Sequence, residues 1–133
     1  MNVPQPLDVN APNVAGAIRY YDDLRETVEA AGARLLVVYF PLSYVIHPED
    51  MGRWRHLGVQ DVDRQVAFDR DFADYLNQRG IACLNLTPHL ASEARRRGRL
   101  YYWLDVHWTP AGNRAAAEAT AGWLVTSPER ARR

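Results

Sequence analysis

The residues best suited to acid–base chemistry lie in one short stretch, Leu100–Asn113, which reads LYYWLDVHWTPAGN. His107 follows Asp105 by two residues and stands just ahead of Thr109 and Pro110, which are typical of a helix start. At this spacing the carboxylate can turn back toward the imidazole. A carboxylate bound to one ring nitrogen fixes the tautomer, so the other nitrogen can take a proton from a hydroxyl nucleophile. We therefore predict a general base, His107, oriented by Asp105; the alternative is an ordinary surface turn.

Nucleophiles are scarce. The only serines are Ser43, Ser92 and Ser127, and none has the strand–turn–helix setting of an activated nucleophile. Ser43 is a weak candidate, and an ordinary loop serine is the preferred interpretation. All sixteen basic residues are arginines, which excludes lysine Schiff-base or lysine general-base chemistry. The single cysteine, Cys83, has apolar neighbours and is predicted to be a buried packing residue.

Three further histidines are candidate site residues. His47 and His56 lie in a long connection and could line a substrate cleft, but solvated loop histidines are the preferred interpretation. His89 could join Asp105 and His107 in a mixed nitrogen and oxygen site of the kind that zinc tolerates. This alternative has little support in the sequence, and we predict neither a metal nor an organic cofactor.

Arginines and tryptophans close to the Asp–His pair offer binding chemistry. A basic cluster could meet phosphate or an anionic polysaccharide, although a solvated helix end is the preferred interpretation. It consists of Arg95, Arg96, Arg97 and Arg99. Trp103 and Trp108 flank the pair and could stack on a sugar ring, and core packing is equally consistent with their positions.

Composition restricts the class of protein. The chain has 133 residues, 47% of them hydrophobic and 24% charged, which suits one globular domain. Sixteen basic residues balance sixteen acidic ones, so we predict neither a nucleic-acid nor a membrane-surface partner. No apolar run approaches a membrane span, and residues 1–12 lack the pattern of a signal peptide. The compartment is left undetermined.

Hydrophobic periodicity and helix-end signals predict alternating helices and strands. The expected helices cover about 13–31, 61–77, 87–97 and 109–125, and the expected strands are Leu35–Phe40 and Ile81–Leu86. We expect Val62, Val66, Phe72 and Leu76 on the inner side of the second helix. The connection through Pro48 and Gly58 is predicted to be a lid or binding loop, with disorder as the alternative. Two parallel strands leave both sheet edges open, so further strands or a partner should pair with them.

The stretch around His107 resembles the last conserved block of SGNH (GDSL-type) hydrolases, where an Asp and a His precede a Pro-Ala-Gly or similar helix start. Leu35–Pro41 resembles the penultimate strand of that family, and the resemblance spans about Val14–Val125. The Asp-x-His-Trp spacing is similar to the branch that includes alginate O-acetyltransferase-like proteins and carbohydrate esterases.

This resemblance implies an α/β fold, a flavodoxin-like three-layer sandwich with a five-stranded parallel sheet. It also implies that Asp105 orients His107, the general base of a serine triad. The family's serine turn and oxyanion-hole blocks do not occur here. By the resemblance, the family's first three strands would precede Met1 and pair beside Leu35–Phe40.

We therefore predict a linker over 1–12, the carboxyl-terminal part of an SGNH hydrolase-like domain over 13–126, and a tail over 127–133. The implied activity is that of a serine esterase or O-acyltransferase on an ester, with acetylated carbohydrate as one candidate. The isolated chain is expected to be inactive and to need an amino-terminal half that supplies the serine. The alternative is a non-catalytic remnant or interaction module that pairs with a partner chain through its exposed strand edge.

Overall fold

The computed structural model describes residues 8, 11–58, 61–103 and 105–127, with two strands among its elements. The elements, in chain order, are α1 Pro12–Ala30, β1 Leu36–Tyr39, α2 Ser43–Ile46, η1 Pro48–Asp50, α3 Met51–Trp54, η2 Arg55–Leu57, α4 Val62–Gln78, β2 Ala82–Asn85, α5 Thr87–Arg97 and α6 Pro110–Thr126. β1 and β2 pair in parallel, from Leu36 opposite Ala82 to Tyr39 opposite Asn85. The predicted linker and tail lie largely outside the described residues.

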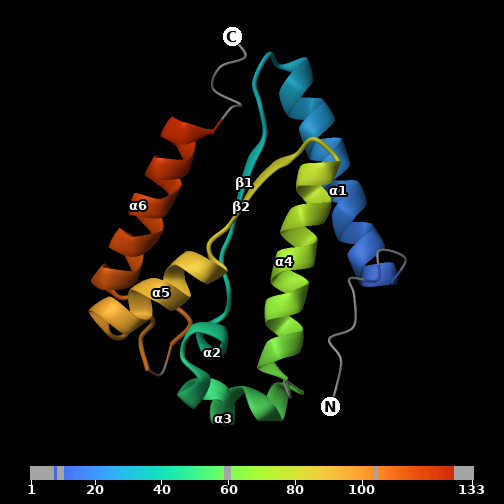
Figure 1. Ribbon diagram of the computed structural model, residues 1–133. Helices are drawn as coiled ribbons and strands as arrows, with labels where there is room; N and C mark the ends of the chain where they lie inside the picture. Colours follow the sequence, from blue (N-terminus) through green and yellow to red (C-terminus); the bar gives the residue numbers. More distant parts are fainter. Residues whose placement is uncertain (1–7, 9–10, 59–60, 104, 128–133) are drawn as a thin grey trace.

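The sheet is the middle of three layers, with α1 and α4 on one side and α5 and α6 on the other (Figure 1). Side chains of a strand alternate between its two faces. Val37 and Tyr39 accordingly join the cluster around Phe72 of α4, whereas Val38 and Leu84 pack against the cluster of α5 and α6. The α/β class with a parallel sheet is confirmed, and the layers form a partial SGNH-like fold.

The helix ends follow local sequence signals. The Asp61 carboxylate accepts a hydrogen bond from the Arg64 N–H at 3.1 Å and caps α4, and the Thr109 hydroxyl accepts one from the Gly112 N–H at 3.2 Å and caps α6. Gly98 ends α5 with a φ of 79°, a backbone conformation that glycine adopts without strain. The prediction that Thr87 caps α5 is wrong: Thr87 is the first residue of the helix, and its hydroxyl donates to the Asp69 carboxylate at 3.1 Å.

The connection after β1 is not the structureless lid that the sequence suggested. It forms the short turns α2, η1, α3 and η2, and every residue of α2 is buried. Tyr44 packs against the Trp54 ring, with 5.3 Å between centroids. Three consecutive apolar residues, Tyr44–Ile46, account for this burial, because removing their side chains from water favours the folded segment.

The buried face of α4 differs from the expected stripe. Phe72 and Leu76 are buried as predicted, but Val66 is 39% exposed. A carboxylate, Asp69, takes part in the buried face instead and is 0% exposed. It accepts hydrogen bonds from the Tyr39 hydroxyl, the Gln65 amide and the Thr87 hydroxyl, which satisfy the buried oxygens and tie α4 to β1 and α5.

Cys83 is buried, as predicted, and burial raises the pKa of its thiol to about 11. The thiol is therefore protonated at neutral pH and serves as a small apolar group. No described helix is both long enough and apolar enough to cross a membrane.

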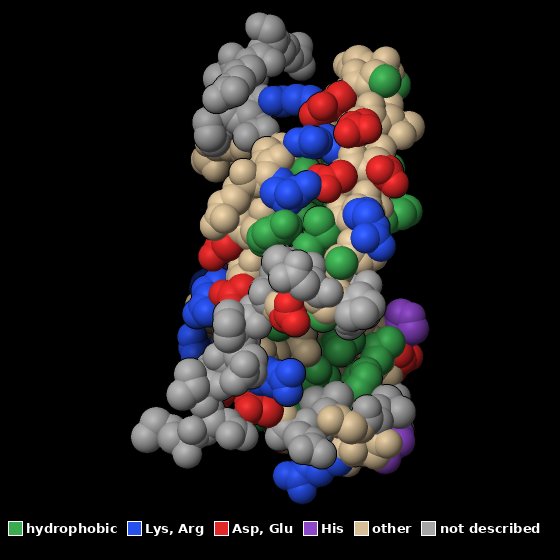
Figure 2. All heavy atoms as spheres, turned by 90° about the vertical axis from the view of Figure 1, so that its right-hand side faces the viewer, with side chains coloured by type: hydrophobic (Ala, Val, Ile, Leu, Met, Phe, Trp, Pro, Cys, Tyr) green, Lys and Arg blue, Asp and Glu red, His purple; other side chains and the backbone are tan. Residues whose placement is uncertain are grey.

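The two outer faces of the molecule differ in character. On the α1 side, acidic and basic side chains are interspersed over the upper part of the face (Figure 2). The Arg79 guanidinium pairs with the Asp22 carboxylate of α1. On the opposite side, β1 has no strand partner at its second edge within the described residues. An apolar groove of about 600 Å³ lies there, and its lining includes Val38, Phe40, Trp108, Ala117, Ala121 and Leu124. The second edge of β1 is therefore unpaired within the described residues, and an apolar groove lies between β1 and α6.

Replacement of Gly112 by alanine should destabilise the fold, because a Cβ there would overlap the backbone carbonyl oxygen of Leu100. We expect the free energy of unfolding to fall by about 3 kcal/mol, the upper end of overpacking costs, in urea titration. Gly122→Ala is the matched control in the same helix, since nothing lies within 4 Å of its added Cβ. That variant should gain about 0.5 kcal/mol from reduced backbone entropy. Equal effects of the two substitutions would contradict the close packing of α6 on Leu100.

Candidate active site

The predicted pair lies at the tip of a narrow loop between α5 and α6. The Tyr102 N–H donates to the His107 carbonyl at 3.0 Å, and Tyr101 forms an antiparallel bridge with Trp108. At the base, the Thr109 N–H donates to the Leu100 carbonyl at 2.8 Å. Two short antiparallel stretches thus hold the loop on the end of α6.

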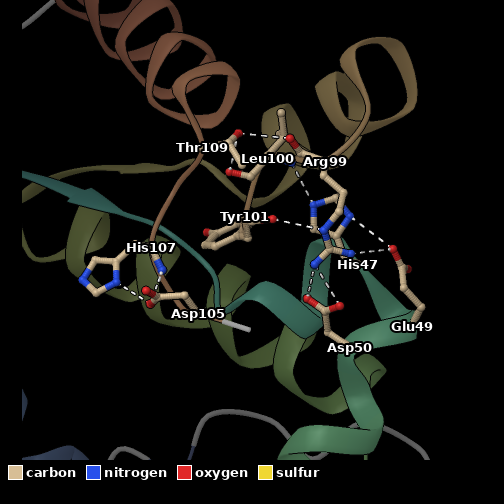
Figure 3. A network of polar contacts seen from close by, with 9 residues as sticks. All are labelled: His47, Glu49, Asp50, Arg99, Leu100, Tyr101, Asp105, His107 and Thr109. Atoms are coloured by element: carbon tan, nitrogen blue, oxygen red, sulfur yellow. Dashed lines mark hydrogen bonds and ion pairs between the residues drawn. The ribbon is translucent and has the colours of Figure 1, made fainter. Parts of the chain in front are cut away.

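Asp105 and His107 are in direct contact. The His107 Nδ1 is hydrogen-bonded to the Asp105 carboxylate, and the same oxygen accepts the His107 backbone N–H at 3.1 Å (Figure 3). The bond to His107 lowers the pKa of the Asp105 carboxyl, so the carboxylate is charged at neutral pH. The His107 side chain is 77% exposed, and its Nε2 has no hydrogen-bond partner among the described residues. The arrangement is that of an oriented imidazole with one nitrogen available for proton transfer.

An open hollow of about 350 Å³ adjoins His107. Its lining is Phe40, Val106, His107, Trp108 and Asn113. Phe40 and Trp108 meet edge to face, with 5.0 Å between ring centroids, and these two residues and Asn113 also line the groove beside β1. The hollow next to the imidazole and the groove beside β1 therefore share part of their lining.

No hydroxyl of the described residues is placed as a nucleophile in this hollow. Ser43 is 2% exposed within α2, and Ser92 lies on α5. The Thr109 hydroxyl, two residues from His107, donates to the backbone carbonyls of Arg99 and Leu100 while it caps α6. The lining thus contains a candidate base without a candidate serine.

His47 is not the solvated loop histidine that the sequence favoured. It is 5% exposed, and its Nε2 accepts a hydrogen bond from the Leu100 N–H at 3.1 Å. Burial and the neighbouring Arg99 cation lower its pKa, against the opposing effect of the Glu49 and Asp50 carboxylates. His56, by contrast, is exposed, in line with the solvated interpretation.

Sequence reasoning missed a buried ion pair beside His47. The Arg99 Nη2 donates to both oxygens of Asp50, at 2.9 and 2.7 Å, and the Asp50 side chain is 0% exposed. Arg99 also donates to Glu49 and to the Tyr101 carbonyl, and its guanidinium lies over the Trp103 ring. Figure 3 shows this cluster on the opposite side of Tyr101 from the Asp105–His107 pair. No local pattern reveals the pair, because 49 residues separate Asp50 from Arg99.

The remaining candidates have other surroundings. Arg96 and Arg97 pair with Glu93, and Arg97 also pairs with Glu118, so two further arginines of the basic cluster are neutralised. Trp108 packs against Tyr101 and Phe40. Within the described part of the chain, no group of three His, Cys, Asp or Glu side chains could hold a metal ion, so the structure does not join His89 to Asp105 and His107.

The chain has known relatives. Residues 4–132 match the model of the SGNH hydrolase-like domain of the acetyltransferase AlgX. The chain belongs to this family. It is also 26% identical over 98 residues to the probable alginate O-acetylase AlgJ of Pseudomonas putida, an alignment that covers 74% of this chain and 24% of that protein. The chain therefore spans about a quarter of the length of this curated relative. No solved structure matches the chain.

Removal of the Asp105 carboxylate should change the tautomer of His107. In the wild-type chain at pH 8, we expect the proton on Nδ1, where the carboxylate accepts it. In Asp105→Ala, the ¹⁵N shifts of the imidazole should move toward a mixture dominated by the Nε2–H tautomer of free histidine. Asp63→Ala, which removes an exposed carboxylate of α4, serves as control and should leave the spectrum unchanged. An Nε2–H tautomer in the wild-type chain would contradict the contact.

Proposed function

We propose that this chain supplies the Asp–His part of the catalytic triad of an SGNH-type serine esterase or O-acyltransferase. The observation that carries the proposal is the Asp105 carboxylate on His107 Nδ1, with the His107 side chain in the lining of an open hollow. Asp105 would hold the tautomer and stabilise the imidazolium, and His107 would act as the general base. Membership of the SGNH acetyltransferase family supports acyl transfer as the reaction class.

The reaction follows from the free nitrogen. Nε2 takes the proton of a serine hydroxyl as its oxygen attacks the ester carbonyl. The leaving alcohol then departs with that proton from the imidazolium, which leaves an acyl-serine. In the second half, Nε2 deprotonates water or a sugar hydroxyl, whose oxygen attacks the acyl carbonyl. The imidazolium then returns that proton to the serine oxygen as the acyl–serine bond breaks. Water as acceptor gives an esterase and a sugar hydroxyl gives an O-acyltransferase.

The serine and the oxyanion-hole donors would come from polypeptide outside this sequence. Among the described residues no serine lines the hollow beside His107, and the chain aligns with only 24% of its relative. We propose that the remainder of an SGNH-like domain adds a parallel strand to the open edge of β1. The groove between β1 and α6 supports this, because Phe40 and Leu124 in its lining expose apolar area that a strand and its side chains would cover.

An acetylated carbohydrate is the substrate class that we propose. The name of the relative refers to alginate O-acetylation, and the aromatic rings of Phe40 and Trp108 next to His107 offer apolar faces of the kind on which sugar rings stack. We propose 13–126 as the functional unit.

The open edge of β1 also supports the second candidate, a non-catalytic interaction module, which would need the edge but not His107.

Reconstitution separates the two candidates. The chain alone should not hydrolyse an acetyl ester of a chromogenic phenol above the buffer rate. Co-expressed with the reading frames that flank its coding sequence, it should give turnover that His107→Ala lowers by at least about 10³-fold. Ser43→Ala is the control and should keep full activity, since this serine is buried away from the hollow. Turnover by the isolated chain that is lost in both variants would make Ser43 the nucleophile, and reconstituted turnover indifferent to His107→Ala would favour the interaction module.

Leu124→Asp should weaken the association that restores activity, because it places a charge in the groove beside β1. We expect the concentration needed for half-maximal reconstitution to rise by about 10-fold or more, with no change in the unfolding midpoint of the chain alone. Tyr20→Asp is matched to it, as an exposed apolar residue on α1 rather than beside the groove. Equal effects of the two variants would show that the groove is not the docking surface.

A further inference from the structure

Leu100 anchors the base of the Asp105–His107 loop through both of its backbone polar groups. Its carbonyl accepts hydrogen bonds from the Thr109 N–H at 2.8 Å and the Thr109 hydroxyl at 3.2 Å. Its N–H donates to His47 Nε2 at 3.1 Å and has no other acceptor among the described residues. Leu100 is 0% exposed, so water is not a ready substitute for His47. One histidine from the connection after β1 therefore holds the backbone that leads into the loop.

His47 can play this part only while its Nε2 carries no proton. The proton of the neutral ring then belongs on Nδ1, which lies 3.6 Å from a Glu49 carboxylate oxygen. The charged groups around the ring are Glu49 and Asp50 on η1 and Arg99 beyond α5, and the Tyr101 ring lies edge-on at 6.2 Å between centroids. Burial and Arg99 lower the pKa of His47 from its ordinary value of about 6.5. The neutral ring is thus the form that the fold favours.

We propose that His47 is a positioning residue for the Asp105–His107 pair, with its unprotonated Nε2 as the buried acceptor that fixes Leu100 and hence the loop. This inference rests on the proposed function in one respect, because the proposed function is what makes the Asp105–His107 loop catalytic. Protonation of His47 at Nε2 would place this N–H opposite the Leu100 N–H. The hydrogen bond that holds the Leu100 backbone would then be lost. Because the folded-state pKa is lowered, this contribution is complete above about pH 6.5 and is lost as the pH falls through the folded-state value.

Two variants test the acceptor role. His47→Leu removes the acceptor, whereas His47→Gln offers an amide oxygen at a similar reach that does not titrate. At pH 8, His47→Leu should lower the exchange protection of the Leu100 amide by roughly 10-fold or more. It should also move His107 from the Nδ1–H tautomer toward the mixture of free histidine. His47→Gln should preserve both the protection and the tautomer.

The tautomer distinguishes positioning from mere stability, because His107 lies far from the substituted atoms in the network (Figure 3). A folded His47→Leu chain with an unchanged His107 tautomer would overturn the proposal. So would a His47→Gln chain that behaves like His47→Leu.

A second measurement needs no disruptive variant. In the wild-type chain, the protection of the Leu100 amide, corrected for intrinsic exchange, should decrease as the pH falls through the titration of His47. In His47→Gln the same quantity should stay flat. Identical pH dependence in the two chains would overturn the proposal. Neither measurement uses turnover, so failed reconstitution would count against the proposed function and leave this inference intact, and the reverse also holds.

Discussion

The carbonyl of Leu100 is the point on which the candidate site depends. It accepts both the backbone N–H and the hydroxyl of Thr109, and the same threonine caps α6. Gly112, one turn into α6, lies so close to this carbonyl that no side chain fits between them. A helix start, a β-bridge and a loop are thereby fixed against one backbone group, so Asp105 and His107 have defined places although both side chains are exposed.

Features that depend on short sequence separations were predictable. The Asp105–His107 contact joins residues two apart, and the Thr109 and Asp61 caps act within three residues. The glycines that end helices are equally local. The pattern of strands and helices followed from periodicity, and with it the parallel α/β class, since chain order alone requires helical crossovers between such strands.

Features that join distant segments were not predictable in the same way. His47 meets Leu100 across 53 residues and Arg99 meets Asp50 across 49, and nothing near His47 distinguishes it from a solvated histidine. Asp69 is a second example, because a carboxylate in the middle of a helix normally indicates a solvent-exposed position. Its three hydrogen bonds come from three elements that only the fold brings together. The burial of α2 did have a local signal, the apolar run Tyr44–Ile46. The length of the connection pointed instead to a lid or binding loop.

Phe40, Trp108 and Asn113 line both the groove beside β1 and the hollow beside His107. A polypeptide that settles in the groove therefore touches the same rings that border the imidazole. Under the proposed function, occupancy of the two spaces would be linked thermodynamically: a bound ester would change the affinity for the incoming polypeptide by the same factor by which that polypeptide changes the affinity for the ester. Assembly of the proposed domain and capture of its substrate would therefore share one apolar wall, formed by residues of this chain.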